Sequence, residues 1–402
     1  MSAWFGAPGS SGAGLGTGSV GASGSLGGSG AALAAGPLDE LLARAPVARY
    51  WASNARDSDC TACHAERVAF SSNSPEHDGS TVRCLLCAHE CVLRPNERGR
   101  CHVRINVEGE LRTLVYGRPI TMHVDPIEKG PFYHFLPGSK TLTMATAGCP
   151  LSCKFCQNWQ ISQAQPEDRK APFTEADGIV HASTERNLRV VTFTYNEPTV
   201  YVEYMTDIAR EARANGVRTA LVSCGLMNPE PLAEVCEVLD AIKIDLKGFS
   251  TDFYEQVCRA ELAPVLRTIA QVAKSGVHLE IVNLVVPTLN DSDEMLRELA
   301  DWVMGEVGPD VPLHFTRFSP AFQLQNLSPT PLATLERARD LAMSRGLRYV
   351  YVGNAPGHPG NSTYCPDCGE RVIHRNGFFV QEETLEDGKC GSCGAPIPGV
   401  FS

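Results

Sequence analysis

Apolar runs alternate with amphipathic stretches from about residue 111 to residue 352, and this alternation constrains the fold most strongly. Seven short apolar runs are predicted as strands, over residues 142–146, 190–195, 219–223, 241–245, 279–285, 313–318 and 349–352. Between them the apolar positions recur at three and four residues, which predicts helices over 200–215, 231–239, 262–275, 294–306 and 331–345. Strand–helix alternation indicates a parallel sheet with right-handed crossovers, here an α/β fold forming a complete or partial (βα) barrel.

Polar or conformationally special residues follow the predicted strands where each one ends. In a βα barrel, the loops after the C-terminal ends of the strands carry the active site. A single charged residue at a strand end is usually a solvated rim residue, but such residues after six consecutive strands indicate a functional site. The candidate residues are Asn196, Glu197, Ser223, Asp245, Asn283, Arg317 and Asn354.

The first strand leads into a loop with three closely spaced cysteines, Cys149, Cys153 and Cys156. Cysteine thiolates hold iron–sulfur clusters, and four of them close such a site. Three would leave one iron of a 4Fe-4S cluster open to the amino and carboxylate groups of S-adenosylmethionine. One electron would then cleave the sulfonium and release a 5′-deoxyadenosyl radical, chemistry that belongs to the cofactor. The alternative interpretation is three unconnected cysteines at a chance spacing.

A second group of cysteines precedes the alternating region. Cys84, Cys87, Cys91 and Cys101 lie within eighteen residues and are separated by turn signals, so we predict a four-thiolate site for zinc or an iron–sulfur cluster. The sequence does not choose between these metals, and buried apolar cysteines remain the alternative. Cys60-Thr-Ala-Cys63-His64 matches the c-type haem attachment pattern, which needs export, and is otherwise a separate site or no site.

The last forty residues carry two Cys-x-x-Cys-Gly knuckles on either side of a predicted hairpin. Their four cysteines predict tetrahedral zinc in a zinc ribbon. So short a segment has little core of its own, so bound metal would supply most of its folding energy. The four ligands are Cys365, Cys368, Cys390 and Cys393.

Composition narrows the class of protein. Sixteen cysteines without a secretion signal point to metal or redox chemistry in the reducing cytoplasm rather than to disulfides. The net charge of −11 argues against nucleic-acid binding, and no apolar run is long enough to span a membrane. We predict a disordered Gly/Ser/Ala-rich tail over 1–36, a Cys-rich metal-binding segment over 37–110, the core barrel over 111–358 and the zinc ribbon over 359–402.

Several motifs together resemble radical SAM proteins related to the pyruvate formate-lyase activating enzyme. The resemblance lies in the Cys149–Asn158 run, Tyr-Asn-Glu-Pro at 195–198, Asp-Leu-Lys at 245–247, Arg-Phe-Ser-Pro at 317–320 and Gly-Asn-Ala-Pro-Gly at 353–357. The four cysteines at 84–101 and the terminal ribbon resemble the radical SAM member of the AmmeMemoRadiSam system. The resemblance covers about residues 80 to 402 and implies a partial barrel of the radical SAM type.

The resemblance also implies roles for single residues. Cys149, Cys153 and Cys156 would ligate the 4Fe-4S cluster, and Phe155 would lie near the adenine of S-adenosylmethionine. Asn196 and Glu197 would meet the methionine amino group, and Ser223 would lie near the ribose or carboxylate. Glycyl-radical activators carry an acidic residue at the position of Val222 here, which puts their cation site in doubt although Asp245 matches one of its members.

These features together predict a radical SAM enzyme with a 4Fe-4S cluster, S-adenosylmethionine and zinc. We expect a protein or peptide substrate and an external one-electron donor such as flavodoxin or ferredoxin. Two alternatives stay open: a small-molecule substrate, or a non-catalytic iron–sulfur and zinc scaffold that carries electrons or docks partners.

Overall fold

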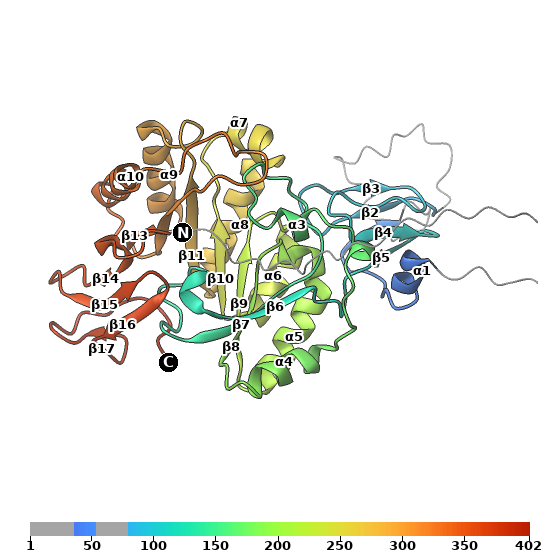
Figure 1. Ribbon diagram of the computed structural model, residues 1–402, viewed down its shortest axis with the longest axis horizontal. Helices are drawn as coiled ribbons and strands as arrows, with labels where there is room; N and C mark the ends of the chain where they lie inside the picture. The colour runs from blue at the N-terminus through green and yellow to red at the C-terminus, as the bar shows by residue number, and fades with distance from the viewer. Residues whose placement is uncertain (1–35, 54–78) are drawn as a thin grey trace, which may run out of the picture. The chain divides into compact units, whose positions relative to one another are not determined.

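An eight-stranded sheet organises the computed structural model, which describes residues 36–53 and 79–402. Its strands are hydrogen-bonded in the order β13-β12-β11-β10-β9-β8-β7-β6, and Figure 1 shows the sheet at the centre of the molecule. They are β6 (Thr121–Pro126), β7 (Lys140–Ala145), β8 (Val190–Phe193), β9 (Arg218–Ser223), β10 (Ala241–Asp245), β11 (His278–Val285), β12 (Leu313–Arg317) and β13 (Val350–Gly353). Strands β7 to β13 are parallel, and β6 is antiparallel to β7.

The predicted parallel α/β sheet is therefore confirmed, and the seven predicted strands correspond to β7–β13. The edge strands β6 and β13 are not paired with each other, so the partial barrel stays a prediction. The sequence did not predict strand β6. Its residues Met122 and Val124 are exposed, so it lacks the continuous apolar run of a strand buried on both faces.

Helices connect the parallel strands, and each buries one apolar stripe. They are α4 (Ala176–Thr184), α5 (Val202–Ala214), α6 (Pro229–Val238), α8 (Leu262–Ser275), α9 (Asp293–Glu306) and α10 (Leu332–Ser344), with short turns α3 (Trp159–Ser162) and α7 (Thr251–Phe253). Local signals set their ends: the Ser292 hydroxyl caps α9 by accepting from the Met295 N–H, and Gly276 ends α8 with a φ of 83°. A one-turn π-helix, Tyr254–Cys258, continues α7.

The two faces of the sheet contact different groups of residues. Outward-facing residues such as Val191 and Ile242 pack with the helices in the main core. Inward-facing Val190, Ala220 and Ala241 pack with a separate cluster that includes Ile127, Phe132, Phe135 and Leu136 of the loop between β6 and β7. This loop fills the inner face at the N-terminal ends of the strands, which leaves space at their C-terminal ends.

The segment before the sheet consists of short elements. They are α1 (Pro37–Leu42), β1 (Trp51–Ser53), β2 (Val82–Cys84), β3 (Val92–Leu93), β4 (Arg104–Val107) and β5 (Glu110–Thr113). A buried ion pair ties this segment to α5, with Arg104 Nη2 2.6 Å from Glu203 Oε1. Residues 37–402 cluster as one compact unit, so the domain boundaries predicted within it stay predictions. Residues 1–35 of the tail predicted over 1–36 lie outside the described residues, as do Cys60, Cys63 and His64.

The C-terminal segment forms two small sheets. They contain β14 (Thr363–Tyr364), β15 (Arg371–Asn376), β16 (Phe379–Glu383), β17 (Leu385–Glu386) and β18 (Lys389–Cys390). Strands β15 and β16 of the first sheet pair antiparallel and form the predicted hairpin. Buried Val372 and Ile373 pack with Tyr133, Tyr349 and Tyr351 of the core. The segment thus has an apolar interface with the core as well as its cysteines.

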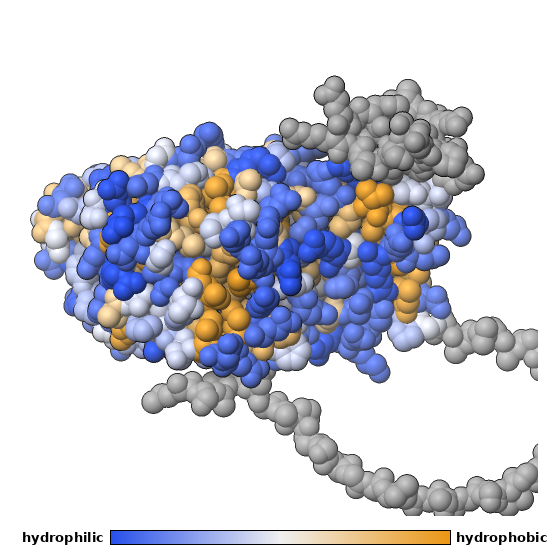
Figure 2. Space-filling model, turned by 90° about the horizontal axis from the view of Figure 1, so that it is seen from above, coloured by the Kyte–Doolittle hydropathy of each residue, from blue (hydrophilic) through white to orange (hydrophobic). Residues whose placement is uncertain are grey.

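The surface in Figure 2 is mostly hydrophilic, with hydrophobic residues gathered in a few small groups. Within residues 36–53 and 79–402, no helix combines the length and apolarity needed to cross a bilayer.

Candidate functional site

The cysteine loop follows β7, and two backbone hydrogen bonds join it to the π-helix. The N–H groups of Ser152 and Lys154 donate to the carbonyls of Cys258 and Val257, at 3.3 and 3.0 Å. Single-turn π-helices occur mostly at functional sites, and here one fixes the loop that carries the cysteines. The three cysteines and Phe155 line a cavity of about 410 Å³ at the C-terminal ends of the strands.

The three sulfurs do not have the spacing of ligands around a single metal ion. Four thiolates on one zinc, each about 2.3 Å from it, stand about 3.8 Å apart. Cys149, Cys153 and Cys156 form no group with all sulfurs within 4.8 Å of one another, although all three line the cavity. Burial raises the pKa of Cys149 well above its usual value, so a thiolate there needs a cationic partner such as iron.

Two further cysteines lie close to this loop. Cys224 is buried and lines the same cavity, and burial raises the pKa of its thiol well above the usual value, with further contributions from the Glu197 carboxylate and the Cys149 thiol. Cys258 hydrogen-bonds Cys153, and this contact is the largest cause of the lowered pKa of Cys153. The sequence carried no signal for Cys258, because the π-helix that positions it has no distinctive residue pattern.

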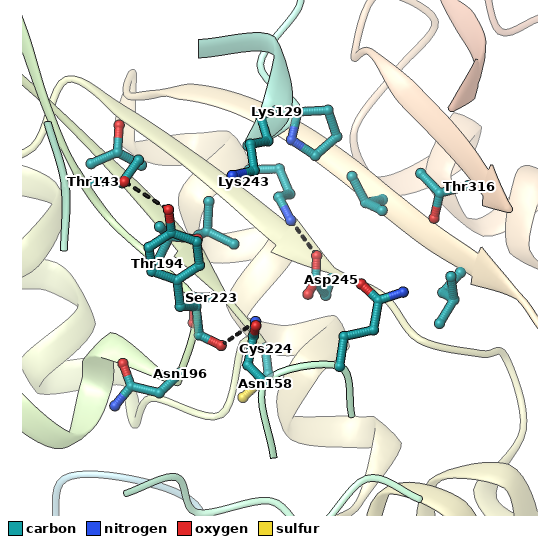
Figure 3. A pocket seen from close by; sticks show the side chains of 18 of the residues that line it. Lys129, Thr143, Asn158, Thr194, Asn196, Ser223, Cys224, Lys243, Asp245 and Thr316 are labelled. Atoms are coloured by element: carbon teal, nitrogen blue, oxygen red, sulfur yellow. Dashed lines mark hydrogen bonds and ion pairs between the residues drawn. The ribbon is translucent and has the colours of Figure 1, made fainter. Parts of the chain in front are cut away.

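Glu197 and Ser223 form a hydrogen-bonded hub at the wall of the cavity. The Glu197 carboxylate accepts from the Ser223 hydroxyl at 2.8 Å, the Cys224 N–H at 2.6 Å and the Thr199 hydroxyl at 2.5 Å. Figure 3 shows Ser223 and Cys224 beside Asn196 on this wall. The hub joins the ends of β8 and β9, so these carboxylate oxygens are already occupied within the protein.

Asn196 has one free acceptor in the cavity wall. Its side-chain Nδ2 donates to the Gly148 carbonyl at 2.8 Å, while its Oδ1 is buried and has no partner among the described residues. A buried polar atom without a partner costs free energy that a ligand can recover. This acceptor therefore fits an ammonium group bound in the cavity.

Charged residues of β10 lie on the floor of the cavity. Asp245 pairs with Lys243 and, at 3.2 Å, with Lys247, and Figure 3 shows Lys243 and Asp245 pointing toward one another. Burial alone would raise the pKa of Asp245, but the two lysines lower it to about 2. The Lys247 ammonium also lies 5.8 Å from the centroid of the Phe155 ring. Phe155 is buried against Phe253, so it forms a fixed apolar wall.

Of three further residues predicted for the site, one lines the cavity and two do not. Asn354, with a φ of 56°, lines the cavity. Asn283 does not, because its neighbours Val282 and Leu284 face inward while its own Nδ2 donates to the Leu246 carbonyl at 2.7 Å. Arg317 is also outside the lining, and its Nε donates to the Thr330 carbonyl at 2.8 Å.

A polar network that the sequence did not predict forms the side of the cavity next to β6. The Tyr195 hydroxyl hydrogen-bonds Asp125 and, at 2.8 Å, Thr143, and Lys129 lies 2.8 Å from Asp125. Although burial opposes it, these partners lower the pKa of Asp125, so the carboxylate is charged at neutral pH. Because β6 itself was not predicted, Asp125 could not be placed at the cavity from the sequence.

Comparison with known proteins identifies the family. The model of the radical SAM superfamily matches residues 144–303, which include the three cysteines and the hub. A Methanocaldococcus jannaschii protein, "Uncharacterized protein MJ0808", is 41% identical over 328 residues, covering 81% of this chain and 97% of that protein. The chain belongs to the radical SAM superfamily.

This radical SAM protein is also similar to activating enzymes. The pyruvate formate-lyase-activating enzyme of Listeria monocytogenes serovar 1/2a is 26% identical over 201 residues, which cover 48% of this chain and 77% of that enzyme. A solved domain of the Bacteroides vulgatus pyruvate-formate lyase-activating enzyme covers 41% of this chain and 98% of that domain, at 18% identity and a TM-score of 0.37. The family model and the relative of 41% identity confirm the predicted radical SAM class, and the family supports the predicted iron–sulfur and S-adenosylmethionine binding.

The C-terminal cysteines of this radical SAM protein form a compact four-sulfur group. Cys365 and Cys393 have sulfurs 3.6 Å apart, and Cys368 and Cys390 have sulfurs 3.7 Å apart. All four ligand atoms lie within 4.8 Å of one another, the spacing of thiolates around one tetrahedral ion. Backbone N–H groups of Cys393 and Ser392 lower the pKa of Cys390 to about 7, which favours the thiolate that a metal needs.

The N-terminal cysteines also converge. Cys84, Cys87, Cys91 and Cys101 line one small cavity of about 20 Å³ together with Arg104 and Pro150. The structure thus brings together all eleven predicted metal-binding cysteines as three separate sets.

Proposed function

We propose that this chain is a radical SAM enzyme that generates a 5′-deoxyadenosyl radical and abstracts hydrogen from a protein or peptide. In this proposal it is the radical SAM member of an AmmeMemoRadiSam system, acts in the cytoplasm and takes electrons from a flavodoxin or ferredoxin. The sheet is proposed to curve into a partial barrel, flanked by a Cys-rich segment before it and a zinc ribbon over 359–402.

The observation that carries this proposal is that three cysteines of one loop line a single cavity without the spacing of ligands around one ion. Cys149, Cys153 and Cys156 would hold a 4Fe-4S cluster and leave one iron without a protein ligand. When bound and reduced, the cluster supplies the electron that cleaves S-adenosylmethionine to methionine and the 5′-deoxyadenosyl radical.

The protein's own residues would bind and orient the cofactor. The free Oδ1 of Asn196 would accept a hydrogen bond from the methionine ammonium. Glu197 would act indirectly, because its carboxylate is engaged by Ser223 and Cys224 and fixes the wall on which Asn196 stands. The buried ring of Phe155 would lie against the adenine, and the lysines beside Asp245 would attract a carboxylate or ribose hydroxyl.

The size of the cavity supports a substrate that enters from outside. About 410 Å³ suits one ligand of cofactor size. S-adenosylmethionine would occupy most of it and leave the substrate to approach at the mouth. Phe378 of the ribbon lines that mouth, and Phe379 beside it is 63% exposed, so an extended chain would contact the ribbon as it enters.

The test is anaerobic reconstitution with iron and sulfide, followed by dithionite and S-adenosylmethionine. We expect 5′-deoxyadenosine from the wild type and none from the triple Cys149→Ala, Cys153→Ala, Cys156→Ala variant. A Cys236→Ala variant is the matched control, since Cys236 lies on α6 away from the three cysteine sets. Formation of 5′-deoxyadenosine by the triple variant would refute the assignment.

A further inference from the structure

The four N-terminal cysteines meet at one closed site between two hairpin-like turns. Cys84 ends β2, Cys87 and Cys91 lie in the turn before β3, and Cys101 precedes β4. Backbone hydrogen bonds clamp the turn to the loop after β9, with the Ala88 N–H 2.9 Å from the Leu226 carbonyl. The ligands are thus placed by the fold and face a shared cavity.

Their spacing differs from that of the zinc-like set at the C-terminus. The C-terminal sulfurs stand 3.6–3.7 Å apart in pairs, as around a single ion. In contrast, no three of the N-terminal sulfurs lie within 4.8 Å of one another. In a cubane cluster each thiolate binds a different iron, so its ligands stand farther apart than those of one ion. The N-terminal set therefore lacks the spacing of ligands around one ion, and wider spacing is what a cluster requires.

A buried cation beside this cavity has one unused donor. The Arg104 guanidinium is 1% exposed, and its terminal nitrogens donate to Glu203 at 2.6 Å and to the Arg49 carbonyl at 3.0 Å. Its Nε–H has no partner among the described residues. Hydrogen bonds to the sulfurs and nearby charge tune the potential of an iron–sulfur cluster, so this donor suits one.

The site shares a wall with the catalytic cysteine loop. Pro150, the residue after Cys149, lines the N-terminal cavity, and its carbonyl lies 3.0 Å from His89 Nε2. Gly148 packs so tightly on the Cys101 carbonyl that a Cβ there would come within 2.3 Å of it. Two clusters at these sites would therefore be close neighbours.

We propose that Cys84, Cys87, Cys91 and Cys101 bind a second iron–sulfur cluster that relays single electrons to the cluster at Cys149, Cys153 and Cys156. The relay rests on the proposed function, whereas the second cluster does not. A low-potential one-electron donor, flavodoxin or dithionite, reduces the second cluster. That electron then passes to the neighbouring cluster, and the second cluster returns to its oxidised state with no bond made or broken.

Metal content tests the site without altering it. The variant with Cys149, Cys153 and Cys156 changed to Ala keeps the N-terminal set intact, and after reconstitution we expect about four irons and four sulfides per chain, against about eight in the wild type. The electron paramagnetic resonance spectrum of the reduced variant should not change when S-adenosylmethionine is added, because every iron has a thiolate. A variant that binds no iron and instead holds two zinc ions would overturn the proposal.

A variant that removes N-terminal ligands and keeps the three central cysteines tests the second cluster independently of the proposed function. Cys84→Ala with Cys87→Ala should lose about half of the iron. Flavodoxin-driven cleavage of S-adenosylmethionine should fall more than dithionite-driven cleavage does. Equal losses with both donors would refute the relay. If the wild type binds about eight irons yet forms no 5′-deoxyadenosine, the proposed function fails and the second cluster stands.

Arg104 is proposed as a positioning residue for this cluster. In the background lacking the three catalytic cysteines, Arg104→Lys keeps a charge near Glu203 but removes the Nε donor, so we expect a more negative midpoint potential. Arg83→Lys is the matched control, since Arg83 also has an unpartnered Nε but does not line the cavity. Equal potentials for the Arg104 and Arg83 variants would contradict this role.

Discussion

Two buried asparagines, Asn196 and Asn283, make similar local contacts in different surroundings. Each donates through Nδ2 to a main-chain carbonyl and leaves Oδ1 without a partner among the described residues. Only Asn196 lines the cavity. The sequence could not separate them, because a strand buried on both faces is apolar throughout and does not reveal which side a polar residue occupies.

The pair provides a matched test of cofactor binding. Asn196→Ala should weaken S-adenosylmethionine binding by about 1.5–3 kcal/mol, about ten- to a hundredfold in Kd, because a hydrogen bond to an ammonium is lost. Asn283→Ala should leave that Kd unchanged and lower the free energy of unfolding by about 1–3 kcal/mol. Anaerobic titration calorimetry and denaturant unfolding measure the two effects. Equal Kd values for wild type and Asn196→Ala would exclude the contact.

At the scale of elements, the alternation of strands and helices could be predicted because the apolar residues of the helices recur clearly at three and four residues. Strand β6 was not predicted because all its residues are exposed or half-buried and show no apolar run, and for that reason the Asp125 network was not predicted either. The ribbon hairpin was predicted from its knuckles, but its docking was not. Arg375 lies 2.6 Å from the Tyr133 carbonyl and 4.3 Å from the Tyr133 ring, contacts between residues far apart in sequence.

Removing the terminal metal ligands should affect the ribbon first. Cys365→Ser with Cys368→Ser should release about one zinc per chain and raise hydrogen exchange mainly in β14–β18, since metal binding supplies much of the folding energy of so small a segment. Metal analysis and hydrogen-exchange mass spectrometry report the two effects, with Cys236→Ser as control. Iron in place of zinc at these four thiolates would refute the assignment.

His134 should make ribbon docking depend on pH. Its ring lies 2.5 Å from both the Pro398 carbonyl and the Tyr351 hydroxyl, and burial lowers its pKa to about 4. The neutral form is favoured in the folded state, so its stabilisation is complete above the unfolded pKa of about 6.5 and is lost as pH falls toward 4.

The comparison variant is His134→Gln, which stays neutral but can still donate and accept. Hydrogen exchange of residues 359–402 should rise more steeply between pH 6.5 and 4 in the wild type than in this variant, both of which keep the ribbon cysteines. Parallel pH profiles for the two proteins would show that His134 does not titrate during undocking.

For the whole molecule, the three cysteine sets lie in different surroundings, and of the three only the C-terminal set has all its sulfurs within 4.8 Å of one another. The sequence predicted the same three groups that the structure brings together, but for the N-terminal set it did not distinguish zinc from a cluster, because that depends on how far apart the folded chain holds the sulfurs. The central site has one competing interpretation, which concerns the number of thiolates that bind the cluster. Cys224 lines the cavity beside the three loop cysteines, where a fourth thiolate would close the cluster.

The open iron is therefore tested most directly by electron paramagnetic resonance of the reduced protein with and without S-adenosylmethionine. The Cys84→Ala, Cys87→Ala background isolates the central cluster. We predict that the cofactor changes the spectrum, because it binds the iron that lacks a thiolate, and that Cys224→Ala does not alter this response. A spectrum unaffected by S-adenosylmethionine until Cys224 is removed would mean that four thiolates close the cluster, and would contradict the account.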